Sequence, residues 1–400
     1  MAEVTQKKTT IAIDPVTRIE GHLKAEVVVE NGKVVDAKLT GGMYRGFESI
    51  LRGRHPRDAA QIVQRICGVC PTAHATAASI ALEKASGTAV PSNGRATRNL
   101  ILGANYLQSH ILHFYHLAGQ DFIQGPDTAP FMPRYAKPDL RLPPAINAVG
   151  VDQYVEALEV RAVCHEMVAL FGGRMPHVHG ILAGGASEIP TKEKLVEYAA
   201  RFKKVRKFVE EKYLPVVYLV GSQYKDLGTF GQGYRNALCV GVFPLDDEGK
   251  EFVFKAGAYQ DGKDMPFDVK RVTEDVKFSW FADSTSGKPF TKGENVLEVD
   301  KKGAYSFVKA PLYNGKPMEV GPLARMWVNN KPISPIGQKL FKEYFGLDVK
   351  NFRDMGEDLA FSLLGRHVAR AEEAYLMLDV IERFLKEVHP DEETFSMPVM

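Results

Sequence analysis

The side chains best suited to metal chemistry lie in one short segment, RICGVCPTAH at residues 65–74. Cys67 and Cys70 are three residues apart, so both thiols lie on one side of a helix or tight turn and can chelate one metal ion. Pro71 can begin the next helix, because the first helical residue needs no N–H partner. His74 follows Cys70 by four residues and can reach the same side. Soft thiolates suit nickel, iron, copper(I) or zinc, so the spacing does not name the metal.

Three other interpretations of the thiol pair remain open on spacing alone. A dithiol redox pair usually lies in a thioredoxin-like βαβ setting, whereas helices are predicted on both sides of this segment. A structural zinc site would need a second CxxC or HxxxH, and the sequence has neither. The two thiols could also be simple buried side chains.

The remaining cysteines and a row of histidines are interpreted as packing residues. Cys164 and Cys239 both lie in apolar segments and are expected to be buried thiols. His110, His113 and His116 follow one another at a spacing of three on one predicted helix. That row could bind a metal, but packing in a helix bundle is the simpler interpretation.

The N-terminal residues have the pattern of a β unit. A short strand at Ile11–Ile13 is followed by two valine-rich strands, Leu23–Glu30 and Val34–Leu39. Between these two strands stands Asn31-Gly32, the strongest short signal for a hairpin.

Helices are predicted next, and they must position the CxxC segment. The helix at about 95–118 has apolar residues at alternating spacings of four and three, which is typical of a bundle seam. Thr191 is a good N-cap for a later helix. The predicted helices are about 56–66, Pro71 to before Gly87, 95–118, 151–171, one beginning at Thr191, and a last one at about 356–388.

Together these elements predict an α+β fold in one integrated domain. Four parts are expected: an N-terminal β unit (1–55), a helical core with the CxxC motif (56–218), a peripheral region of strands and loops (219–333), and C-terminal helices (334–400).

Composition excludes several classes of protein. The 400 residues are 45% hydrophobic and 25% charged, which is ordinary for a globular protein and unlike a disordered one. A net charge of +2 argues against a nucleic-acid-binding protein. The longest apolar stretches fall short of the roughly 18 residues of a transmembrane helix. Four cysteines are too few for a disulfide scaffold, and no apolar region of a signal peptide follows the first ten residues.

Several longer blocks carry a family resemblance. RICGVCPTAH is accompanied, in this order along the chain, by DPVTRIEGH at 14–22, YRGFE at 44–48, HFYHL at 113–117, FGGRMPH at 171–177 and EVGPLAR at 319–325. From about Thr9 to its last residues the sequence closely resembles the large subunit of nickel–iron hydrogenases, and in particular the nickel–iron–selenium group. The resemblance implies the α+β fold of that subunit and the reversible heterolytic oxidation of H₂ at a nickel–iron centre.

The resemblance also implies roles for residues around the metals. Cys67 would be a terminal nickel ligand, and Cys70 would bridge nickel and iron, whose remaining ligands are diatomic. His74 would lie beside the bridging sulfur, and Asp121 beside the diatomic ligands of the iron. Such neighbouring groups orient and tune a metal site.

Two further carboxylates take roles from the same resemblance. Glu20 would relay protons near the nickel thiolates, a task suited to a carboxylate. From the sequence alone, Glu20 could equally be a surface residue paired with Arg18. Glu48 would be a ligand of a structural magnesium ion, a hard cation that prefers oxygen. Its simpler interpretation is a solvated charge.

The resemblance implies partners as well. The family passes electrons through iron–sulfur clusters, and this chain has too few cysteines to hold them. An electron-transferring small subunit is therefore expected to dock near residues 172–177, and maturation factors are expected to insert the metals. Periplasmic residence would follow from export together with a signal-bearing small subunit; without such a partner the expected compartment is the cytoplasm.

The sequence departs from the family most clearly near its C-terminus. The family has a second CxxC, or Sec-x-x-Cys, close to its C-terminus, whereas no cysteine follows Cys239 here. An arginine-bearing block and a histidine of the magnesium site are absent too. The chain is therefore expected to be truncated and, as written, inactive towards H₂. The alternative is a non-catalytic paralogue or fragment that acts only as a metal-binding or partner-binding scaffold.

Overall fold

The computed structural model describes residues 8–125, 129, 132 and 139–399. Contacts between residues divide the chain into two compact units. The first, here the sheet unit, comprises Met1–Arg52 and Asp268–Met318; the second, the helical unit, comprises Gly53–Phe267 and Glu319–Met400. This grouping differs from the four predicted parts, because the region predicted as peripheral contributes to both units.

The sheet unit is built on a three-stranded antiparallel sheet, in the order β1 (Lys8–Ile13), β2 (Leu23–Glu30) and β3 (Lys33–Gly41). Asn31 and Gly32 connect β2 to β3 with positive φ angles of 52° and 77°. A two-residue hairpin turn of this kind requires positive φ at both positions. The hairpin predicted from the sequence is therefore confirmed.

The later segment of the sheet unit packs on the end of β3. The Phe307 N–H donates to the Gly41 carbonyl (2.9 Å), and the Gly41 N–H donates to the Ser306 hydroxyl (3.0 Å). Tyr44 lies with its ring against Phe281 and Phe307. The remaining helix and strands of this unit are α1 (Phe47–Leu51), β11 (Val272–Asp275) and β12 (Ala310–Tyr313).

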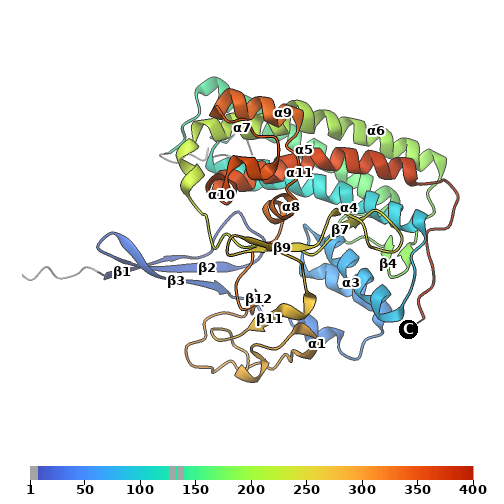
Figure 1. Cartoon of the computed structure of the whole chain (residues 1–400), viewed down its shortest axis with the longest axis horizontal. Helices are drawn as coiled ribbons and strands as arrows, with labels where there is room; N and C mark the ends of the chain where they lie inside the picture. Colours follow the sequence, from blue (N-terminus) through green and yellow to red (C-terminus); the bar gives the residue numbers. More distant parts are fainter. Residues whose placement is uncertain (1–7, 126–128, 130–131, 133–138, 400) are drawn as a thin grey trace, which may run out of the picture. The chain divides into compact units, whose positions relative to one another are not determined.

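The helical unit contains the large apolar core. In Figure 1, the long helices α5, α6 and α11 run alongside one another. Its helices are α2 (Ala59–Val63), α3 (Pro71–Ser86), α4 (Ser92–Leu112), α5 (Pro144–Gly172), α6 (Lys192–Phe208), α7 (Leu214–Gln223), α8 (Pro322–Val328), α9 (Pro335–Leu340), α10 (Glu357–Ala360) and α11 (Leu363–Glu387). The predicted apolar seam of α4 is confirmed as core: Leu100, Ala104, Leu107 and Ile111 are fully buried.

Short strands complete the helical unit. β6, β9 and β10 form a three-stranded antiparallel sheet, and the others pair in twos. The strands are β4 (Ile181–Leu182), β5 (Gly185–Ala186), β6 (Ala237–Cys239), β7 (Val242–Pro244), β8 (Phe252–Phe254), β9 (Gly257–Gln260) and β10 (Lys263–Met265).

Helix ends show where the sequence predictions hold and where they fail. Thr191 caps α6 as predicted, with its hydroxyl accepting the Lys194 N–H (3.3 Å). The single helix predicted at 356–388 is wrong, because the chain breaks between α10 and α11. Ser362 caps the new helix by accepting the Gly365 N–H (3.1 Å).

Two other helices differ from prediction in their bounds. α4 begins at Ser92, and its predicted last turns form a π-helical segment, His113–Ala118. α5 begins at Pro144 rather than at Val151, because proline is well placed at a helix start.

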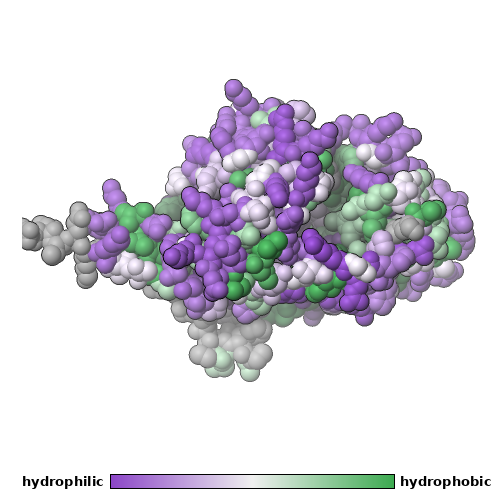
Figure 2. Space-filling view, turned by 90° about the horizontal axis from the view of Figure 1, so that it is seen from below, coloured by the Kyte–Doolittle hydropathy of each residue, from purple (hydrophilic) through white to green (hydrophobic). Residues whose placement is uncertain are grey.

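The surface has the character of a globular protein. On the face shown in Figure 2, hydrophilic residues predominate and hydrophobic ones form small separate groups. Scattered exposed apolar side chains of this kind are normal for folded proteins. Within the described ranges, no helix has the length and apolarity needed to cross a bilayer.

Candidate metal centre

The two thiols of the CxxC motif lie in a short loop between two helical segments. A 3-10 helix, Gln64–Ile66, ends at Cys67, whose backbone is extended (φ −143°, ψ 128°). Pro71 then begins α3, as predicted, and Cys70 is the residue that precedes it. The Cys70 backbone N–H donates to the Cys67 sulfur (3.2 Å). A hydrogen bond of this kind stabilises negative charge on the sulfur.

This loop is accessible, whereas the other cysteines are not. The side chains of Cys67 and Cys70 are half-buried. Cys164 and Cys239 are 0% and 2% exposed, and burial raises the pKa of both thiols. The predicted burial of Cys164 and Cys239 is confirmed, and the accessible sulfurs are those of the CxxC motif.

The helical segment before the loop is anchored to the chain that follows α5. Gln64 is fully buried and donates its side-chain amide to the Val178 carbonyl (2.9 Å). Gln61 donates to the same carbonyl (3.3 Å). The Thr72 hydroxyl, at the start of α3, contacts the Met175 sulfur (3.9 Å). The block at 172–177 therefore packs beside the CxxC segment.

His74 and Asp121, the other predicted residues of the centre, both lie in the helical unit. His74 is on α3, one turn beyond Cys70, and partial burial lowers its pKa. Asp121 lies in a 3-10 turn, Gly119–Asp121, that follows the π-helical segment. Among the residues that the structure describes, no three His, Cys, Asp or Glu side chains come close enough to hold one metal ion. The described donor set is thus a pair of sulfurs, whose softness fits nickel and iron.

Glu20 and Glu48 lie in the sheet unit, and both carboxylates are exposed. Glu20 follows Arg18, whose φ is positive (65°), in the bend between β1 and β2. Glu48 lies in the first turn of α1.

Comparison with known proteins decides the family. A model of the nickel-dependent hydrogenase family matches residues 45–125 and 120–398, and a HoxL-like model matches residues 10–40. The periplasmic [NiFeSe] hydrogenase large subunit of Desulfomicrobium baculatum is 59% identical over 397 residues, which are 97% of this chain and 77% of that protein. The chain belongs to the nickel-dependent hydrogenase family.

Other relatives agree with this assignment. The hydrogenase-2 large chain of Escherichia coli K12 is 33% identical over 383 residues, covering 80% of this chain and 67% of that one. The reduced Ni-Fe-Se hydrogenase of D. vulgaris Hildenborough matches with a TM-score of 0.95 and 69% identity, covering 98% of this chain and 82% of the solved chain.

The predicted family, the predicted fold and the predicted function as a hydrogenase large subunit are thereby confirmed. The chain has the fold and function of a [NiFeSe] hydrogenase large subunit, an oxidoreductase that acts on H₂. Membership implies nickel and iron at the active site, and a large subunit implies a small-subunit partner.

The histidine row of this hydrogenase packs between helices, as predicted. The His116 ring stacks edge-on against Tyr154 (centroids 4.8 Å apart), and His113 lies 5.8 Å from His367. Burial lowers the pKa of His113 to about 3 and that of His367 to about 4. Both rings are therefore neutral near pH 7.

The third member of the row, His110, belongs to a buried charge cluster that sequence reasoning missed. Its Nε2 lies 2.8 Å from a Glu373 carboxylate oxygen, and Arg325 pairs with the same carboxylate. Arg370 donates to His110 Nδ1 (3.1 Å). Because arginine only donates, Nδ1 accepts and the proton of the neutral ring is on Nε2.

The charges in this cluster are set by burial and pairing. Burial lowers the pKa of His110 to about 4 despite the carboxylate beside it. Burial alone would raise the pKa of Glu373, but Arg325 and the His110 hydrogen bond outweigh it and hold the pKa at about 2. In the sequence, His110 stood out in the histidine row and Arg325 in the EVGPLAR block, but nothing linked either residue to Glu373.

The neighbouring carboxyl on α11 has the opposite character. Glu372 accepts from the Tyr218 hydroxyl (2.6 Å), the Ser334 N–H (2.8 Å) and the Ser334 hydroxyl (3.2 Å). Burial raises its pKa to about 7, because these donors are neutral and only partly offset the loss of water. No local motif marks this site.

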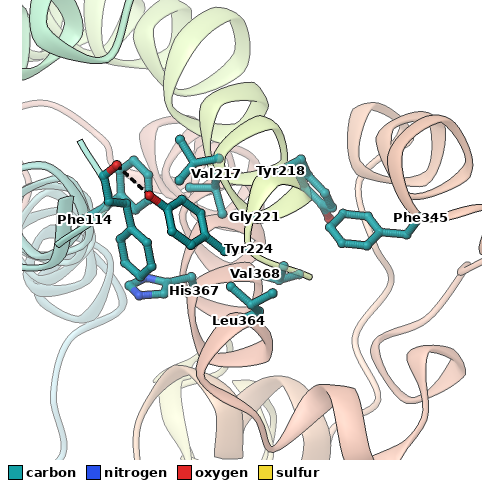
Figure 3. A pocket seen from close by; sticks show the side chains of 11 residues that line it. Phe114, Val217, Tyr218, Gly221, Tyr224, Phe345, Leu364, His367 and Val368 are labelled. Carbon is teal, nitrogen blue, oxygen red and sulfur yellow. Dashed lines mark hydrogen bonds between the residues drawn. The ribbon is translucent and has the colours of Figure 1, made fainter. Parts of the chain in front are cut away.

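An apolar pocket lies near the end of the histidine row. Tyr224 donates its hydroxyl to the Phe122 carbonyl (3.1 Å), shown as the dashed line in Figure 3. His367 is the one basic residue in the lining. The lining comprises Phe114, Phe122, Val217, Tyr218, Val220, Gly221, Tyr224, Phe345, Leu364, His367 and Val368.

Proposed function

We propose that Cys67 and Cys70 hold the nickel–iron centre of this hydrogenase, with Cys67 as a terminal nickel ligand and Cys70 as the sulfur bridge to iron. The observation that carries the proposal is the hydrogen bond from the Cys70 N–H to the Cys67 sulfur (3.2 Å). It orders two accessible thiols in one loop, while Cys164 and Cys239 are buried. Metals bound at this loop would supply Lewis-acid polarisation of H₂.

Three other residues would act around this centre. His74 lies one helical turn beyond Cys70 and would contact the bridging sulfur. Asp121 would lie beside the diatomic ligands of the iron and orient them. The exposed carboxylate of Glu20 would accept a proton from the centre and pass it to solvent, as a general base of modest basicity can.

Glu48 is proposed as a ligand of a structural magnesium ion. Its carboxylate is exposed in the first turn of α1 and offers the oxygen donors that this hard cation prefers. Magnesium content should fall in Glu48→Gln and remain unchanged in Glu26→Gln, which alters another carboxylate of the sheet unit.

The partner is proposed to be an iron–sulfur small subunit that docks near residues 172–177, with maturation factors inserting the metals. Met175 of that block contacts Thr72 beside the CxxC motif, and Val178, which follows the block, accepts from Gln64, so a subunit bound there would lie close to the thiols. Periplasmic residence is proposed through export with the small subunit, since a similar protein is periplasmic. Fractionation of the native host, with and without the small-subunit gene, tests both statements.

Serine variants of all four cysteines test the metal assignment. Each is expressed in the native host with the small subunit and maturation machinery, and nickel and iron are measured in the purified complex. Cys67→Ser and Cys70→Ser should lose most of their metal, because each removes a proposed ligand. Cys164→Ser and Cys239→Ser are the matched controls and should retain it. Equal metal loss from Cys239→Ser would contradict the assignment.

A further inference from the structure

Gln108, on α4, lies beside the CxxC loop and contacts its backbone. Its side chain is fully buried. The side-chain amide donates to the Val69 carbonyl (3.1 Å), at the residue just before Cys70, and to Asn105 Oδ1 (3.3 Å). A helix far from the motif in sequence therefore reaches the peptide between the two proposed ligands.

The other end of the same amide is also held. Gln108 Oε1 accepts from Arg161 Nε and from His165 Nε2, each at 3.3 Å, and both residues are on α5. Arginine cannot accept a hydrogen bond, so the atom facing Arg161 must be the oxygen. The nitrogen then faces the Val69 carbonyl, which can only accept. The partners on both sides thus fix the orientation of the amide.

The contact bears directly on the thiols because a peptide unit is planar. The Val69 carbonyl and the Cys70 N–H belong to one peptide plane, so the direction of the carbonyl sets the direction of the N–H. That N–H is the donor to the Cys67 sulfur. Holding the carbonyl towards Gln108 keeps the N–H aimed at the sulfur.

We propose that Gln108 is a positioning residue for the metal-binding loop: by fixing the Val69–Cys70 peptide, it sets the relative placement of the Cys67 and Cys70 sulfurs. This inference rests on the proposed function of the two cysteines as metal ligands. Loss of a group that orients ligands commonly lowers metal affinity about 10- to 100-fold. The same range is expected here.

Two substitutions separate positioning from simple polar packing. Gln108→Glu keeps the size and the oxygen that accepts from Arg161 and His165, but it has no amide hydrogen for the Val69 carbonyl. Gln108→Met removes both functions. Asn93→Leu is the matched control, since Asn93 is a buried amide on the same helix that bonds the backbone of His389 and Glu392.

The experiment titrates the full 400-residue chain with Co²⁺ alone and follows the sulfur-to-cobalt charge-transfer absorption. Gln108→Glu and Gln108→Met should each weaken Co²⁺ binding about 10- to 100-fold and change the charge-transfer spectrum. Asn93→Leu should leave both unchanged. Wild-type affinity and spectrum in Gln108→Glu would overturn the proposal, because Gln108 would then serve only Arg161 and His165. If Gln108→Met fails to fold, Gln108→Glu still decides.

A metal-free measurement distinguishes failure of this inference from failure of the proposed function. Alkylation of Cys67 and Cys70 is followed by peptide mass analysis at one fixed pH, with buried Cys164 and Cys239 as internal references. Release of the loop in Gln108→Glu should change the alkylation rates of the CxxC thiols several-fold, because the Cys70 N–H would no longer be held towards the Cys67 sulfur. If wild type and Cys67→Ser bind Co²⁺ alike, the metal assignment fails while the alkylation rates still test the positioning. Unchanged alkylation in both Gln108 variants would overturn it.

Discussion

Gln108 and His110 lie two residues apart on α4, yet they belong to two polar sites that differ in exposure and charge. Gln108 holds the backbone of a loop whose sulfurs are half-exposed. His110 joins Arg325 and Glu373 in a cluster where the carboxylate is fully buried and pairs with both neighbours. The first arrangement keeps reactive atoms accessible, and the second neutralises charge inside the core. One helix therefore supports both binding and stability, through two different faces, because side chains two residues apart on a helix point in nearly opposite directions.

The comparison predicts that substitutions at the two sites change the stability of the fold by different amounts. The largest loss is expected for substitution of Glu373. Glu373→Leu should lower the free energy of unfolding of the metal-free chain by about 3–5 kcal/mol, because Arg325 would be left buried without its carboxylate. Cys67→Ser should cost less than about 1 kcal/mol, since the thiol is half-exposed. Urea denaturation followed by circular dichroism measures both.

The comparison would be contradicted if Glu373→Leu lowered the free energy of unfolding no more than Cys67→Ser does. Glu382→Gln provides a second control, because its carboxylate pairs with Arg206 at the surface. Exposed ion pairs contribute little and are weakened by salt. Added salt should therefore leave the effect of Glu373→Leu nearly unchanged.

A second prediction concerns the loss of stability at low pH, where His110 is expected to account for about 2 kcal/mol of the free energy of unfolding. The folded pKa of His110, about 4, lies below its ordinary value of 6.5. Between these values the unfolded chain binds the proton and the folded chain does not, so stability is lost as the pH falls from 6.5 towards 4. His110→Gln can still donate to Glu373 and accept from Arg370, but it does not titrate.

Unfolding of wild type and His110→Gln is compared at pH 7 and pH 5. Between pH 7 and pH 5, the free energy of unfolding of wild type should fall by about 2 kcal/mol more than that of the variant. The size follows because each pH unit between the two pKa values corresponds to about 1.4 kcal/mol for one group. Parallel pH curves for the two proteins would show that His110 is protonated in the fold. The cluster would then lack the neutral imidazole on which the comparison depends.

The two sites also differ in how far the sequence could predict them. Cys67 and Cys70 are close in the chain, so their spacing suggested that both could bind one metal ion. Pro71 marked the start of the next helix. Hairpins such as β2–β3 are equally local, because Asn31-Gly32 specifies its own turn. Glu373 lies 263 residues from His110, and the cluster that it forms with His110 and Arg325 joins three helices, α4, α8 and α11. A polar residue on a helix has the same appearance in sequence whether it is solvated or paired across the core.

Gln108 was missed for the same reason. Its contact joins α4 to a loop 39 residues earlier, and nothing in the local pattern separates it from an exposed glutamine. The family resemblance gave the ligands but not the side chain that orients their backbone. The proton-relay role of Glu20 and the magnesium-ligand role of Glu48 likewise came from the resemblance and stay predictions.

The last and smallest prediction concerns the break before α11, the helix that carries Glu373. The sequence predicted one helix over about 356–388, but Ser362 starts a new helix by accepting the Gly365 N–H. Gly365 is also required there, since a Cβ would lie 2.1 Å from the Leu359 carbonyl oxygen. Ser362→Ala should cost about 1 kcal/mol through loss of the cap. Ser362→Thr keeps a hydroxyl and should restore most of that loss.

Measured together, these variants show whether the cap and the charge cluster act independently. Ser362 and Glu373 share no hydrogen-bond partner, and distant, independent changes usually add within about 0.5 kcal/mol. The double variant Ser362→Ala with His110→Gln should therefore lose the cap energy at both pH 7 and pH 5, while the pH dependence follows His110→Gln alone. A cap effect that grows at low pH would instead mean that the start of α11 controls how Glu373 meets His110, and the buried cluster would then depend on a local helix signal.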